Sequence, residues 1–281
     1  MLHDIYLDAI KNREDKIAGI SLDLNKNIFG KAQELWKEYK PLSRGSMLVG
    51  VDSSYNKHNF QGFYLYVIDA VCVRLDGSII AKKYESKIRV IDQRQFEAKS
   101  MWMESEVAAQ AADTSDLVLI DGSLIARFIL ASSAAIRSAL DLIDKHSNII
   151  FISKTSDSRE IFDRMNSKVG DIYYFNCISN KAGYSRPYHI TRYEEKCGRP
   201  VTVVFARLSD YTPLIKLEFP KEVDETDVQR TIDQIAFQSV SGYPYVLKTA
   251  HNTAVITDAD VKRLVSIYGL KNEISAREVL R

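Results

Sequence analysis

Three acidic side chains occupy positions from which they could bind a divalent metal ion. Asp52 ends one apolar run, LVGVD, and Asp121 ends a second, LVLID. If the two runs form neighbouring parallel strands, both carboxylates emerge at the same edge of a sheet, where ligands of open α/β sheets bind. An aspartate that follows a buried strand is usually a turn former or a helix N-cap. Because two aspartates, Asp52 and Asp121, each end a separate apolar run, a binding site is nevertheless favoured.

The third acid, Glu104, lies between the other two in a segment with helical spacing. It precedes Val107 by three residues and Ala108 by four, so it shares the apolar face that should pack on the sheet. A carboxylate on such a face is costly unless it is paired or binds a metal. Glu106 is the alternative, but two residues further along a helix it points elsewhere and is expected to be solvated.

Three carboxylates brought together repel one another, and a hard divalent cation relieves that repulsion. Mn²⁺ and Mg²⁺ prefer oxygen ligands and leave room for water and a substrate phosphate. Two such ions about 3.5–4 Å apart stabilise both the attacking and the leaving oxygen when a phosphodiester is cleaved. The three acids therefore predict metal-assisted hydrolysis of a phosphodiester.

The elements that must position these acids follow in the order three strands, helix, strand, helix, strand, helix. Residues 46–91 predict an antiparallel meander of three strands, with Asp76-Gly77 as a hairpin turn. The other patterns predict helices within 3–40 and at 93–113, 123–144, 156–165, 224–240 and 257–268, and strands at 117–121, 148–153, 172–178, 186–193, 201–208 and 214–219. The fold class is therefore α/β, with a mixed sheet flanked by helices and added N-terminal helices.

The composition limits the possible class of protein but does not identify a binding partner. The 281 residues are 46% hydrophobic, and 38 Lys and Arg against 37 Asp and Glu leave a net charge of +1. This neutral total neither supports nor excludes binding to nucleic acid. Three widely spaced cysteines without a CxxC pair argue against a zinc knuckle and for reduced thiols in the cytoplasm. No apolar run approaches the roughly 20 residues of a membrane span, so no membrane partner is expected.

Four ordered segments resemble the NurA nuclease family, which has an RNase H-like core, and the helix that carries Glu104 fits between them. The four segments are VGVDSSYN (49–56), LVLIDGSL (117–124), ISKTSDSR (152–159) and GYPYVLKTAH (242–251). The resemblance implies that 1–281 is a single nuclease domain, with a helical region at 1–45 and an RNase H-like core with C-terminal strands and helices at 46–281. The first motif of the family often reads Asp-Gly-Ser, whereas this chain has Asp52-Ser53-Ser54, which leaves the turn geometry open.

The resemblance also implies roles for individual residues. Asp52, Glu104, Asp121 and His251 would bind the metal and act in catalysis. Tyr243 matches the C-terminal tyrosine of the family, as a catalytic and DNA-contacting residue, and Tyr245 is the competing tyrosine. Lys154 follows the run NIIFIS at the same expected edge, where a lysine could contact DNA by neutralising the charge of the scissile phosphate. A solvated loop lysine is the alternative reading of that position.

The activity that the resemblance implies is a Mn²⁺-dependent deoxyribonuclease, with Mg²⁺ as the alternative ion. It would act on single- and double-stranded DNA, as a 5′–3′ exonuclease and single-strand endonuclease, in DNA end resection for recombinational repair. The expected partners are DNA, a second copy of the chain and a hexameric HerA-type ATPase. Two other hypotheses stay open: a catalytically silent RNase H-like scaffold that binds repair partners, and an RNase H-like enzyme that acts on RNA or hybrids.

Overall fold

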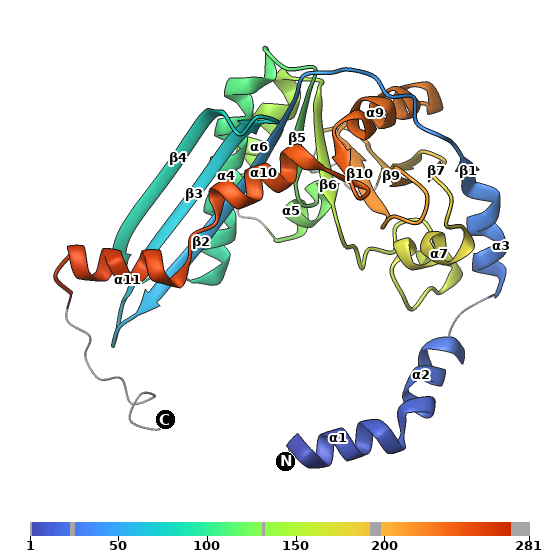
Figure 1. The fold of residues 1–281 in the computed structure, drawn as a ribbon, viewed down its shortest axis with the longest axis horizontal. Helices are drawn as coiled ribbons and strands as arrows, with labels where there is room; N and C mark the ends of the chain where they lie inside the picture. The colour runs from blue at the N-terminus through green and yellow to red at the C-terminus, as the bar shows by residue number, and fades with distance from the viewer. Residues whose placement is uncertain (1, 23–25, 91, 131–132, 192–197, 271–281) are drawn as a thin grey trace.

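A ten-stranded mixed sheet forms the centre of the computed structural model, which describes residues 2–22, 26–90, 92–130, 133–191 and 198–270 (Figure 1). Its strands are β1 (Trp36–Glu38), β2 (Leu48–Asn59), β3 (Tyr64–Arg74), β4 (Ile79–Arg89), β5 (Leu117–Asp121), β6 (Ile149–Ser153), β7 (Gly183–Ser185), β8 (Tyr188–Ile190), β9 (Val201–Arg207) and β10 (Ile215–Phe219). The spatial order is β1-β7-β9-β10-β6-β5-β2-β3-β4, and β8 pairs with β9 beside this path.

One half of the sheet has the arrangement expected of an RNase H-like core. β2, β3 and β4 form the predicted antiparallel meander. β5 pairs with β2 in parallel, and β6 pairs with β5 in parallel. The predicted fold, a three-strand meander continued by parallel strands and flanked by helices, is confirmed.

The other half of the sheet is antiparallel. β10 pairs with β6, and β9 and β7 follow it outward. The edge strand β1 lies within residues 3–40, where the spacing of apolar residues predicted helices. That prediction is wrong for residues 36–38. The reason is a long-range contact: Lys37 pairs with Tyr184 of β7, and the Tyr39 N–H donates to the Ala182 carbonyl.

Helices cover both faces of the sheet. The helices of the described residues are α1 (Leu2–Lys11), α2 (Arg13–Leu22), α3 (Lys26–Leu35), α4 (Gln93–Ala112), α5 (Leu124–Leu130), α6 (Ser133–Lys145), α7 (Asp171–Ile178), α9 (Glu225–Phe237), α10 (Tyr245–Ala254) and α11 (Asp258–Ile267). Side chains of α3, α4, α5, α6 and α7 share one apolar core, and those of α9 and α10 share another on the opposite face. The predicted helix 123–144 is therefore two helices, α5 and α6, and residues 131 and 132 between them lie outside the described part.

Two predicted elements of the middle of the chain are wrong. Residues 172–178 were expected to form a strand but belong to helix α7, which buries Tyr174 and Phe175. The predicted helix 156–165 is reduced to a short 3₁₀ turn, Asp163–Met165. Both differences share a cause, because the Asp171 carboxylate at the start of α7 accepts the Ile161 and Phe162 N–H groups, which a helix at 156–165 would need for itself.

A glycine lets α10 lie directly on the central strand. A Cβ on Gly50 of β2 would come within 2.5 Å of the Val246 carbonyl oxygen of α10, a distance that real side chains do not reach. Helix α10 is preceded by a small hairpin of β11 (Ser239–Val240) and β12 (Tyr243–Pro244). Close packing against Gly50 thus fixes where α10 presents its polar residues over β2.

The N-terminal helices differ in how they meet the sheet. Helix α3 buries Ile28 and Ala32 in the core, whereas α1 buries none of its residues and points away from the sheet (Figure 1). The division of the chain at residue 45 stays a prediction. Within the described ranges, no helix is both long and apolar enough to cross a membrane.

Candidate metal centre

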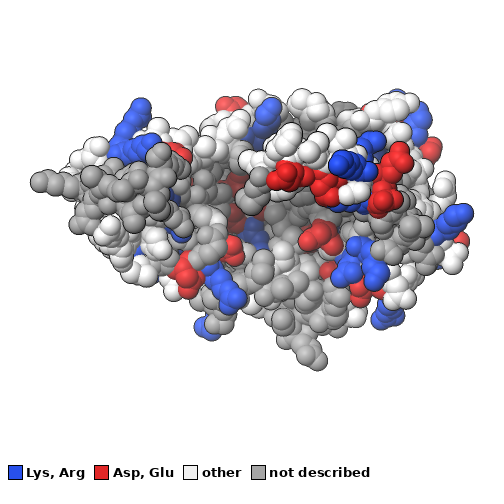
Figure 2. Space-filling view, turned by 90° about the horizontal axis from the view of Figure 1, so that it is seen from below, with Lys and Arg blue, Asp and Glu red and all other residues white. Residues whose placement is uncertain are grey.

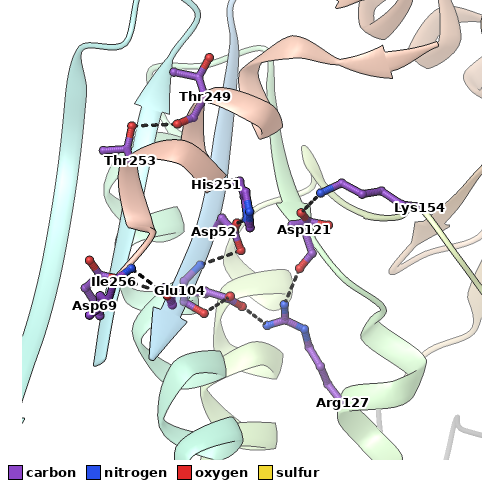
Figure 3. A network of polar contacts seen from close by, with 12 residues as sticks. Asp52, Asp69, Glu104, Asp121, Arg127, Lys154, Thr249, His251, Thr253 and Ile256 are labelled. Carbon is purple, nitrogen blue, oxygen red and sulfur yellow. Dashed lines mark hydrogen bonds and ion pairs between the residues drawn. The ribbon is translucent and has the colours of Figure 1, made fainter. Parts of the chain in front are cut away.

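Asp52, Glu104 and Asp121 come from three different elements and lie around one edge of the sheet (Figure 3). The parallel register of β2 and β5, with Val51 opposite Ile120, carries Asp52 and Asp121 to neighbouring positions. Asp52 does not end its strand as predicted, because β2 continues to Asn59 through its pairing with β3. Glu104 reaches the site from α4, and both Glu104 and Asp52 are over 90% buried.

Each of the three carboxylates has a basic partner. Glu104 Oε2 lies 2.6 Å from Arg127 Nη1, and Asp121 Oδ2 lies 2.9 Å from Lys154 Nζ. His251 Nδ1 donates to Asp52 Oδ2 over 2.9 Å. Since an unpaired buried carboxylate is costly, these three contacts explain how the acids are tolerated together.

Arg127 is the functional candidate that the sequence analysis missed. It is buried, its Nη2 donates to the Asp121 carbonyl over 2.9 Å, and its guanidinium lies 5.2 Å from the centre of the Phe151 ring. Arg127 therefore links Glu104 of α4 to the end of β5. A signal was present, because Arg127 is the one charged residue in the apolar run LIARFIL.

The pKa of Asp52 reflects both its burial and its acidic neighbours. Burial, followed by the nearby Glu104 and Asp121 carboxylates, raises the pKa of Asp52 to about 6, although the His251 hydrogen bond acts in the opposite direction. Burial also raises the pKa of Asp69, on the neighbouring strand β3, to about 7, with the Asp52 charge adding to the effect. A fourth acid, half-buried, thus lies beside the three that the sequence pattern identified.

The side chains at this site suit a hard divalent ion, and in this structure each of the three carboxylates is paired with a basic residue. Carboxylate oxygens and one imidazole nitrogen are ligands for Mn²⁺ or Mg²⁺. Across the described ranges, no three His, Cys, Asp or Glu side chains are already gathered closely enough to hold an ion. Glu104 Oε2, although beside Arg127, is buried without a hydrogen bond of good geometry. That unsatisfied acceptor fits a metal ligand.

The structure favours Glu104 over Glu106 as the acid that α4 contributes to the site. Glu106 is exposed and pairs with Lys83 of strand β4 at 3.4 Å, outside the site. Glu104 instead accepts a hydrogen bond from Ser53 Oγ of β2 at 2.5 Å in addition to its contact with Arg127. The helical spacing that separated the two acids in the sequence therefore predicted their positions correctly, whereas the ligand role itself stays a prediction.

Tyr243 and His251 also reach this edge, from the C-terminal hairpin and helix. His251 lies on helix α10, which the Gly50 contact holds over β2. The Tyr243 hydroxyl is buried without a well-formed hydrogen bond, and burial together with the Asp121 and Asp52 carboxylates raises its pKa. Tyr245 begins α10 and is 39% exposed, so the geometry favours Tyr243 over the competing tyrosine.

Lys154 lies at the end of β6, beside the site, as its position in the sequence predicted. Its ammonium group contacts Asp121 and sits 4.7 Å from the centre of the Tyr243 ring. About half of the side chain is exposed, so it can turn toward a ligand. Among the described residues on the face shown in Figure 2, acidic and basic side chains are interspersed and form no continuous basic band.

Comparison with known proteins gives a consistent result. The family model described as the NurA domain matches residues 47–256. The protein named DNA double-strand break repair nuclease NurA from Sulfolobus acidocaldarius is 22% identical, over 97% of each chain. The crystal structure of the NurA nuclease from Sulfolobus solfataricus has a TM-score of 0.80 at 20% identity, covering 96% of this chain and 97% of that one. A crystal structure of NurA with manganese has a TM-score of 0.69 at 9% identity, covering 94% and 99%.

Proposed function

Because this chain belongs to the NurA family, we propose that it is a divalent-metal-dependent nuclease that hydrolyses phosphodiester bonds in DNA. The observation that carries the proposal is the convergence of Asp52, Glu104 and Asp121 from a parallel strand pair and a facing helix. Burial, together with the nearby Glu104 and Asp121 carboxylates, raises the pKa of Asp52, which is typical of a functional site. The names of the relatives, which are DNA repair nucleases, support the same reaction.

The roles of the individual side chains follow from their contacts. Asp52, Glu104, Asp121 and His251 would hold the metal, whose chemistry is to polarise the phosphodiester and to lower the pKa of the attacking water. His251 also orients the Asp52 carboxylate through its Nδ1 hydrogen bond. The Tyr243 hydroxyl, buried beside Asp121, would donate to a phosphate oxygen.

Lys154 would release Asp121 when substrate binds. Its half-exposed ammonium group can move to a phosphate oxygen, because the Asp121 carboxylate would then be neutralised by the metal. Arg127 is too deeply buried to follow. It would stay beside Glu104 and the Asp121 carbonyl and keep helix α4 in register with β5.

Manganese is the ion that we propose, supported by the related structure that contains it. The finer activity that we propose is 5′–3′ exonuclease cleavage together with endonuclease cleavage of single strands, in DNA end resection for recombinational repair. The proposed setting is the cytoplasm, where free thiols such as Cys72 and Cys177 persist.

We also propose that the chain forms a homodimer and works with a hexameric HerA-type ATPase. Helix α1 exposes Leu2, Ile5, Tyr6 and Ile10 and buries no residue, which supports a contact surface there. Light scattering should report a dimer for the full chain and a monomer after deletion of residues 1–22. The deletion spares α3, whose buried side chains belong to the core. An unchanged mass would show that α1 and α2 do not form the dimer contact.

The activity itself is tested with end-labelled single- and double-stranded DNA, RNA and hybrid duplexes in Mn²⁺, Mg²⁺ or EDTA. We expect metal-dependent cleavage of DNA and a loss of about 1,000-fold in Asp121→Asn, as for other groups that stabilise transition-state charge. Glu106→Gln is the matched control, because Glu106 is exposed and outside the site.

The outcomes separate the competing functions. Full activity of Asp121→Asn would contradict the site assignment. Cleavage of RNA or hybrids in place of DNA would change the substrate class. No cleavage of any substrate, with or without a HerA-type ATPase, would favour the silent scaffold.

A further inference from the structure

A largely apolar pocket of about 450 Å³ opens directly beside the carboxylates. Its floor and walls come from the segment before and into β10, from the turn of the β11–β12 hairpin and from α10. Pro213, Leu214 and Gly242 form its apolar part, and Tyr243 forms an aromatic wall.

The pocket shares its walls with the candidate metal centre. Lys154 lines it, and the same ammonium group contacts Asp121 Oδ2 at 2.9 Å and lies 4.7 Å from the centre of the Tyr243 ring. His251 also lines it while donating to Asp52. A ligand bound in the pocket is therefore separated from the carboxylates by no more than a single side chain.

A second pocket flanks Asp121 on the other side of Lys154 and has a different character. It measures about 690 Å³, and its lining is mostly polar and charged, with several serines, four acids and the cations Lys154, Arg159 and Lys216. A lining of this kind offers little to an apolar ring. The pocket beside Tyr243 combines apolar walls with two exposed cations, Lys154 and Lys248.

These features fit one kind of ligand, a flat apolar ring attached to an anionic chain. We propose that the pocket takes the unstacked base of the nucleotide next to the scissile phosphate, with Lys154 and Lys248 facing the backbone phosphates. The proposal rests on the nuclease function above and deepens it. Because a base can enter such a pocket only when it is unpaired, the enzyme should require single-stranded or frayed DNA at the point of cleavage.

The pocket should accept all four bases. Its aromatic and apolar walls act through stacking and burial, which every base can supply, whereas discrimination needs hydrogen-bonding groups aimed at base edges. We therefore expect the rate to depend on whether a base is present and to depend little on which base it is.

The test compares single-stranded DNA substrates that carry one abasic nucleotide at each position around a defined cleavage site, in Mn²⁺. Removal of the base that enters the pocket should lower kcat/KM about 5- to 150-fold, the value of one base–aromatic stack. An abasic nucleotide several positions away should leave kcat/KM unchanged.

A variant supplies the second arm. Pro213 is exposed at the pocket mouth, so Pro213→Trp should fill the pocket and abolish the difference between intact and abasic substrates. Tyr211→Trp, on the same loop but outside the lining, is the control that should retain it. Thermal unfolding establishes that both variants are folded.

Equal cleavage of intact and abasic substrates at every position would overturn the base pocket and leave the proposed nuclease standing. A rate loss that is the same for near and distant abasic nucleotides would also overturn it. Absence of cleavage of any DNA would overturn the nuclease proposal, and the base pocket with it.

Discussion

Replacing Arg127 by methionine should destabilise the metal-free protein far more than replacing an exposed arginine. Arg127 and Glu104 are each over 90% buried, and their charged atoms lie 2.6 Å apart. Methionine is close in length to the arginine stem, so Arg127→Met removes the charge and leaves most of the packing. The Glu104 carboxylate then remains buried without its cation.

The magnitude follows from what an uncompensated buried charge costs. Breaking one side of a buried ion pair costs about 3–5 kcal/mol. At roughly 2–4 °C per kcal/mol for a chain of about this size, Tm should fall by about 6–20 °C. Arg127→Met combined with Glu104→Gln removes both charges, so the double variant should recover much of that loss.

The assay is thermal unfolding in EDTA and in excess Mn²⁺, with Arg137→Met on an exposed position of α6 as the control. If Glu104 is a metal ligand, Mn²⁺ supplies the missing positive charge, and the Tm difference between Arg127→Met and the wild type should shrink. A Tm difference below about 2 °C in EDTA would refute the account of Arg127 as the counter-ion. A Tm difference that Mn²⁺ does not change would refute Glu104 as a ligand.

Three further predictions concern the same site. Since the pKa of Asp52 is raised from 3.8 to about 6, its contribution to metal-free stability should be lost as pH rises from about 4 to 6. Asp52→Asn should gain up to about 3 kcal/mol over the wild type across that range in urea unfolding with EDTA, and parallel pH profiles would contradict the shift. Gly50→Ala should cost about 1–3 kcal/mol or more because its Cβ meets α10, whereas Gly45→Ala, which meets nothing within 4 Å, should be close to neutral by calorimetry. Tyr243→Phe should lower the rate of DNA cleavage by at least ~10-fold through loss of one hydrogen bond to a charged group, and Tyr245→Phe should not change it; equal rates for both would exclude a role for the Tyr243 hydroxyl.

Local patterns in the sequence were sufficient for the RNase H-like half of the sheet. Each of its strands is an apolar or β-rich run bounded by turn residues, and their order leaves few ways to pair. The same patterns located Asp52 and Asp121 on adjacent strands and separated Glu104 from Glu106 by helical spacing. These features depend on residues only a few positions apart, so the sequence alone predicts them.

Segments without a clear hydrophobic period were predicted less well. Residues 172–178 are mostly apolar and aromatic and show neither a clear helical nor a clear strand periodicity, so their aromatic content favoured a strand. The structure makes them helix α7 because Asp171 accepts N–H groups from the preceding loop. Residues 36–38 became a strand for a similar reason, since their partner β7 lies far along the chain.

The sequence by itself determined which acids could meet and on which elements they stand. Only the tertiary structure decided what surrounds them: Arg127 against Glu104, His251 on a helix against Asp52, and an apolar pocket of about 450 Å³ beside Tyr243. The contact between His251 and Asp52 joins residues 199 positions apart. Such contacts depend on how whole elements pack, here on the close approach of α10 to Gly50, and no local spacing encodes that packing.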